Sequence, residues 1–169
     1  MKKITKLFCL AALAILFTQA ASAQKFGHIN STLLLSFMPE TKMADSTLTK
    51  FGADLEGRLK TMGVEYQAKV QEFQSLEASM SGPIRDSKIK EITDLEERIA
   101  QFQESAQQSI VSKKEETYSP IIEKAQDAIQ AVAKEGSYTY IFDTSAGVLL
   151  HAADSDDIMS LVKAKLGIR

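Results

Sequence analysis

The chain has 169 residues, with 20 lysines and arginines against 22 aspartates and glutamates, and a formal net charge of −2. This balance lacks the strong positive charge of a nucleic-acid-binding protein, so we expect no nucleic-acid partner. The single cysteine, Cys9, cannot form a disulfide within the chain. The length corresponds to about one ordinary domain.

The N-terminal residues have the pattern of a cleavable signal peptide. Residues 1–6 carry three lysines and no acid, and residues 7–17 form an apolar run too short to span a bilayer. Ala21-Ser22-Ala23 provides the small residues that signal peptidase reads, which predicts cleavage before Gln24. A transmembrane anchor is disfavoured by the short run, and a lipoprotein by the absence of a small residue before Cys9. Cleavage would remove Cys9 and three lysines, so the net charge would fall from −2 to −5.

The next segment predicts a short strand followed by helices. Residues 25–30 alternate apolar and polar side chains, as a half-buried strand does. Ser31 or Thr32 is expected to cap a short apolar turn through residues 33–38. Pro39 and Glu40 suit the first turn of a long helix.

A long apolar stripe at helical spacing dominates the middle of the chain. It runs from Leu48 to Met80, breaks at Ser81-Gly82-Pro83, and resumes from Ile89 to Ile110. Two long helices joined by a tight turn, each covering the stripe of the other, predict an antiparallel coiled-coil hairpin. Three glycines, at 52, 57 and 63, suggest a compliant arm, although they would also be tolerated on a helix surface. Pro120 is expected to kink the returning helix, and Gly136 to end it.

The C-terminal segment predicts two strands and a helix. Residues 138–142 and 148–151 are rich in β-branched, aromatic and aliphatic side chains and flank a turn, which predicts a β-hairpin. Asp154 or Ser155 is expected to cap a last helix that ends at Gly167. We expect its buried face to contain Ile158, Leu161, Val162 and Leu166. The fold class is therefore α+β and mostly α, with a helical arm inserted between base strands.

No pattern in the chain indicates an enzyme, a cofactor or a metal site. The sequence has no phosphate-binding glycine loop and no nucleophile elbow. Its two histidines, His28 and His151, lack a supporting cluster of carboxylates, so strand histidines without chemistry are favoured over ligands or acid–base groups. The arm glutamates are expected to form a solvated face.

The order of these parts resembles the Skp/OmpH family of periplasmic chaperones for outer-membrane proteins. The resemblance is carried by Phe26-Gly27-His28-Ile29-Asn30 and Met38-Pro39-Glu40 near the start. Near the end it is carried by residues 138–143, Gly147-Val148-Leu149-Leu150 and Ser155-Asp156-Asp157-Ile158. It covers the whole chain after the signal peptide. The arms of well-known members are strongly basic, whereas here the basic residues near the tip are balanced by acids.

The resemblance implies a periplasmic homotrimer whose base is an intersubunit β-barrel and whose arms surround a cavity. Unfolded outer-membrane β-barrel proteins would be held there without nucleotide. It implies a signal peptide over 1–23, a base over 24–38 and 121–169, and an arm over 39–120. Base residues would include Phe26, Ile29, Tyr140, Phe142 and Leu149.

Near the tip, Met80 and Ile84 would contact clients, or they would pack the end of the helical seam. We expect no membrane span, while transient contact with a membrane surface stays open. The alternative function is a structural coiled-coil spacer or adaptor of the cell envelope, which would bind folded partners.

Overall fold

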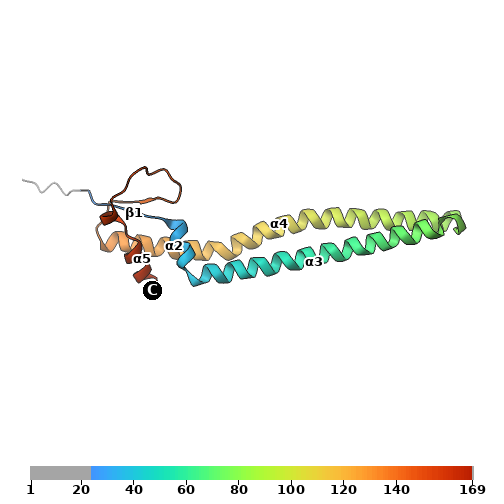
Figure 1. Cartoon of the computed structure of the whole chain (residues 1–169), viewed down its shortest axis with the longest axis horizontal. Helices are drawn as coiled ribbons and strands as arrows, with labels where there is room; N and C mark the ends of the chain where they lie inside the picture. The colour runs from blue at the N-terminus through green and yellow to red at the C-terminus, as the bar shows by residue number, and fades with distance from the viewer. Residues whose placement is uncertain (1–23, 169) are drawn as a thin grey trace, which may run out of the picture.

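The structure is a computed structural model that describes residues 24–168, and the predicted signal peptide over 1–23 lies outside the described residues. A small base carries one long helical arm that projects to one side (Figure 1). Between residues 24 and 168, no helix combines the length and apolar character needed to cross a membrane.

The arm is an antiparallel pair of helices, α3 (Pro39–Leu76) and α4 (Gly82–Glu135). A single 3₁₀ turn, η1 (Glu77–Ser79), leads from α3 to the connection at Ser81, and Pro83 stands in the first turn of α4. This confirms the hairpin and its turn. The helix α4 continues through Pro120 without a break, and Gly136 caps its end as predicted.

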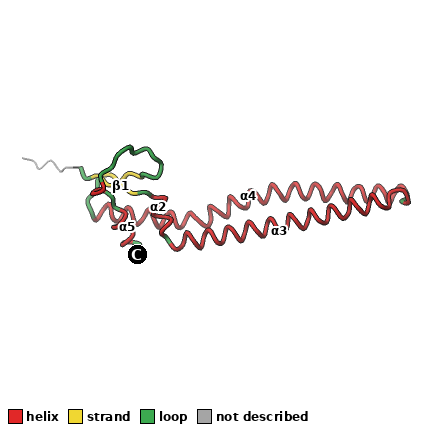
Figure 2. The backbone as a smooth tube through the Cα atoms, in the orientation of Figure 1, coloured by secondary structure: helices red, strands yellow, loops and turns green. Residues whose placement is uncertain are grey.

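The base contains a two-stranded sheet whose strands come from opposite ends of the chain. The strands β1 (Phe26–Ile29) and β2 (Tyr140–Asp143) pair in parallel, with Phe26 opposite Tyr140 and His28 opposite Phe142. The whole helical arm therefore forms the crossover between two neighbouring parallel strands (Figure 2).

The predicted hairpin between residues 138–142 and 148–151 is wrong for the described chain. Residues 148–151 form no strand, and β2 pairs with β1 instead. The physical reason lies at the end of β2, where Asp143 Oδ1 accepts a hydrogen bond from the Ser145 backbone N–H at 2.9 Å. This turn directs the chain away from the sheet into the loop over residues 144–153, which arches off the base in Figure 2.

The short helices begin at residues other than those predicted. Asn30 rather than Ser31 or Thr32 caps α2 (Ser31–Phe37), because its side chain accepts from the Leu33 N–H at 2.9 Å. The last helix, α5 (Met159–Lys165), begins later than predicted, and Asp154 to Asp156 form a separate 3₁₀ turn, η2. The cause is pairing with β1: the Ile158 N–H donates to the His28 carbonyl at 3.0 Å, which keeps residues 157 and 158 out of the helix.

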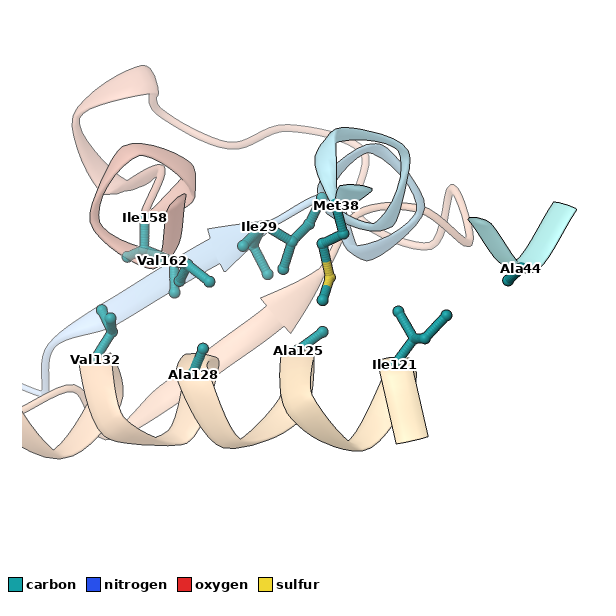
Figure 3. Close-up of a cluster of buried hydrophobic side chains, with 10 residues drawn as sticks. Ile29, Met38, Ala44, Ile121, Ala125, Ala128, Val132, Ile158 and Val162 are labelled. Atoms are coloured by element: carbon teal, nitrogen blue, oxygen red, sulfur yellow. The ribbon is translucent and has the colours of Figure 1, made fainter. Parts of the chain in front are cut away.

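The core of the base forms where α4, α5, β1 and the start of α3 meet. Figure 3 shows Val132 and Ala128 of α4 facing Ile158 and Val162, and Ala125 and Ile121, further along α4, on the side of Ile29 and Met38. Small alanines on α4 let α5 and β1 approach its surface closely. The prediction for α5 is correct for Ile158 and Val162, which are fully buried, and wrong for Leu161, which is 50% exposed. Ile158 and Val162 are four positions apart and share the face of the C-terminal helix that is buried in the core. Leu161 lies off that face.

Candidate functional site: the strand face and the arm tip

Three aromatic side chains form an exposed patch on one side of the sheet, which we call the strand face: Phe26, Tyr140 and Phe142. Their ring centroids lie 6.0 to 6.4 Å apart, with Phe26 and Tyr140 stacked. All three are exposed, Tyr140 by 57%. Because side chains alternate along a strand, those of Ile29 and Ile141 point to the other side, toward the base core.

The two sides of the sheet therefore place the predicted base residues differently. Phe26, Tyr140 and Phe142 gather on the strand face, whereas Ile29 is buried in the core of its own protomer with 2% exposure. Leu149 is half-buried and lines a shallow cavity with Phe26 and Phe142. The structure thus brings four of these five residues to one side of the base.

A network of hydrogen bonds holds the end of β2 against α2. Asp143 accepts from the Ser31 N–H at 3.1 Å, from the Ser31 hydroxyl at 2.5 Å and from the Ser145 N–H at 2.9 Å. Burial acts to raise the pKa of Asp143, but these hydrogen bonds outweigh it and lower the pKa to about 2. The carboxylate is therefore a structural acceptor that fixes Phe142, its neighbour in β2.

The loop over residues 144–153 carries apolar side chains that the protomer does not cover. Val148 and Leu150 are the most exposed large apolar residues among those that the structure describes, and Leu150 is 97% exposed. The sequence prediction named Leu149 as a base residue and missed these two neighbours. A run of three consecutive aliphatic residues after a turn is the signal that identifies them.

Both histidines line the cavity beside the strand face. His28 Nε2 lies 3.0 Å from the Ala153 carbonyl oxygen, and His151 and Asp156 lie on the same cavity wall. Among residues 24–168, no group of three or more histidine, cysteine, aspartate or glutamate side chains could hold a metal ion. The contact with Ala153 instead helps to hold the C-terminal segment on β1.

The arm tip, residues 76–91, presents a second apolar surface. Ile84 is 54% exposed, Met80 is half-buried, and Leu76 and Ile89 are also exposed although the stripe predicts them on the seam. Leu76 leaves the seam because α3 ends there and the chain continues into a 3₁₀ turn. Seam-end packing therefore describes Met80 better than Ile84.

Two ion pairs join α3 to the part of α4 that lies within the arm tip. Lys69 pairs with Glu91 and Lys88 with Glu72, each at 2.9 Å. The contact with Lys69 lowers the pKa of Glu91, and the contact with Glu72 raises the pKa of Lys88. The glutamates are thus partly engaged across the hairpin and not only solvated. These exposed pairs set the register of the two helices more than they stabilise them.

The base and arm together define a class of protein: a small base that carries a long helical hairpin, with exposed apolar surfaces at both ends. The chain belongs to the outer membrane protein (OmpH-like) family, whose model matches residues 25–166. This confirms the family resemblance inferred from the residues.

The relatives support the same assignment. The chain is 23% identical over 156 residues to the chaperone protein Skp of Pectobacterium atrosepticum, covering 90% of this chain and 93% of that protein. It is 24% identical over 155 residues to the chaperone protein Skp of Yersinia enterocolitica, with the same coverage. A solved structure of an OmpH-like protein from Caulobacter crescentus has a similar fold, with a TM-score of 0.75 at 13% identity, covering 88% of this chain and 87% of that one.

Proposed function

We propose that the protein is an ATP-independent holdase chaperone of the periplasm that keeps unfolded outer-membrane β-barrel proteins soluble. The observation that carries the proposal is the family match over nearly the whole described chain, joined to relatives named as chaperones. The long arm supports holding rather than chemistry, because its apolar side chains are spread along a surface. Many weak contacts of that kind bind an unfolded chain through avidity.

We propose further that the protein works as a homotrimer assembled through the strand face. A two-stranded sheet is marginal by itself, and the edge of β2 away from β1 is available for pairing, whereas residues 157 and 158 already bond to the outer edge of β1. Three exposed aromatic rings beside these edges have a large apolar area to bury. Residues 148–150, which the sequence predicts as part of a strand and of which Val148 and Leu150 are exposed, would pair with a neighbouring protomer and close an intersubunit barrel.

Clients would be held between the arms, with Met80 and Ile84 contacting them near the tips. The balanced charge of the tip supports apolar contact over electrostatic capture, because the lysines 69 and 88 already have carboxylate partners on the opposite helix. Export through the signal peptide, with cleavage before Gln24, would place the protein where such clients pass.

The deciding experiment dilutes a urea-unfolded outer-membrane β-barrel protein into increasing amounts of the mature chain and follows light scattering. We expect suppression of aggregation that saturates near one client per three chains. Ile84→Asp should weaken suppression, whereas the matched control Val64→Asp, at a somewhat more exposed apolar site further down the arm (63% against 54%), should weaken it less. Absence of suppression by folded protein would overturn the holdase and favour an envelope spacer that binds folded partners.

A further inference from the structure

We propose that the mature chain begins with a pyroglutamate formed from Gln24. The inference rests on the export proposed above, because only cleavage after Ala23 gives Gln24 a free α-amine. In an N-terminal glutamine, the α-amine nitrogen attacks the side-chain Cδ of the same residue. A new C–N bond closes a five-membered lactam, the bond from Cδ to the amide nitrogen breaks, and ammonia leaves. The step needs no oxidant, reductant or second substrate.

The structure leaves Gln24 accessible at the edge of an anchored segment. Gln24 is exposed, whereas the next residue is held at three points. The Lys25 carbonyl accepts from the Thr139 N–H at 2.7 Å, and Lys25 Nζ donates to the Gly136 carbonyl at 2.9 Å. Lys25 Nζ also lies 4.0 Å from the centroid of the Tyr138 ring. Ring closure at residue 24 would therefore disturb none of these contacts.

The fold does not need the positive charge that cyclisation removes. The carboxyl end of α4 favours a nearby cation, because its last carbonyl groups lack partners within the helix. Lys25 Nζ already occupies that position at Gly136. The α-ammonium of Gln24 would add a second positive charge beside Lys25, and a neutral lactam removes it.

The lactam would protect the strand on which the proposed assembly depends. The strand β1 has four residues and begins at Phe26, so only Gln24 and Lys25 separate the strand face from the new terminus. Aminopeptidases need a free α-amine and would reach Phe26 after two cleavages. A terminal lactam denies them the first one.

Intact mass of the chain purified from its native cells tests the proposal. We expect the mass of residues 24–169 less one ammonia. The mass of residues 24–169 with the ammonia retained, or of a chain beginning at another residue, would overturn the pyroglutamate while leaving export in place. A mass that still includes residues 1–23 would overturn both.

A matched variant tests the protective role. The native chain should keep Phe26 during incubation with an aminopeptidase, whereas mature Gln24→Ser, which cannot form the lactam, should lose its first residues. Equal loss from both proteins would overturn the proposal, and loss only from the variant would support it. Circular dichroism before digestion verifies that both proteins are folded.

Discussion

The Ser31 hydroxyl donates a hydrogen bond to Asp143 Oδ2 at 2.5 Å and so joins the first residue of α2 to the last residue of β2. The two residues lie 112 positions apart, with the whole arm between them. This contact joins the N-terminal and C-terminal segments of the base. The pairing of β2 with β1 places Tyr140 and Phe142 beside Phe26 and so forms the strand face.

The low pKa of Asp143 predicts a loss of stability in acid. A carboxyl group whose pKa is lower in the folded than in the unfolded state stabilises the fold above its unfolded pKa, and this contribution disappears as the pH falls through its folded value. The usual pKa of an aspartate is 3.8, and the pKa of Asp143 in the fold is about 2. We expect Asp143→Asn to be less stable than the native chain at pH 7, and the difference to shrink between about pH 4 and pH 2. Urea unfolding at several pH values measures it.

Asp54→Asn is the control for this experiment, because Asp54 pairs only with Arg58 one turn away on the arm, at 3.0 Å. It should change stability little at any pH. A constant difference between Asp143→Asn and the native chain from pH 7 to pH 2 would contradict the assigned role of Asp143.

Gly57 on α3 is predicted to cost stability that alanine would restore. A Cβ built at this position meets nothing within 4 Å, so no packing requires the glycine. Gly57→Ala should raise the free energy of unfolding by up to about 1 kcal/mol, because alanine favours the helix. Gly136→Ala should instead destabilise, since its Cβ would lie 2.4 Å from the Tyr138 ring. Thermal unfolding compares the two, and equal effects would contradict the assignment.

The two faces of α5 should respond differently to truncation. Ile158 caps α5 and is fully buried between α4 and β1, so Ile158→Ala should cost about 2–5 kcal/mol through lost burial and the cavity left behind. Leu161→Ala, three residues along, should change stability by no more than about 0.5 kcal/mol, because half of that side chain is exposed. Chemical denaturation decides this, and a large loss in Leu161→Ala would indicate that the oligomer buries it.

The strand face should control assembly. Tyr140→Ser removes an exposed ring that is stacked on Phe26, and burial of such a ring contributes about 2 kcal/mol. We expect sedimentation analysis to detect a shift toward smaller species at low protein concentration. Val64→Ser on the arm removes an exposed apolar side chain far from the base and should leave the mass unchanged. An unchanged oligomer in Tyr140→Ser would exclude the strand face as the assembly surface.

The features that depend on neighbours along the chain could be predicted from the residues alone. The apolar stripe identified the helical hairpin because side chains three and four positions apart share a helix face. Ser81-Gly82-Pro83 marked the turn and Gly136 the helix end because backbone conformation at those positions is set locally. The family could be inferred because these local features occur in a characteristic order.

Which distant segments meet depends on long-range pairing and packing, and it could not be predicted from local patterns. The pattern of residues 138–142 identifies a strand but carries no information on its partner. In the structure this strand pairs with β1 and not with residues 148–151. The later start of α5 and the exposure of Leu161 follow from the same event, because pairing with His28 draws residues 157 and 158 along β1. The strand face likewise exists only once β2 has paired with β1. Such contacts join residues more than a hundred positions apart, and local periodicity does not encode their pairing.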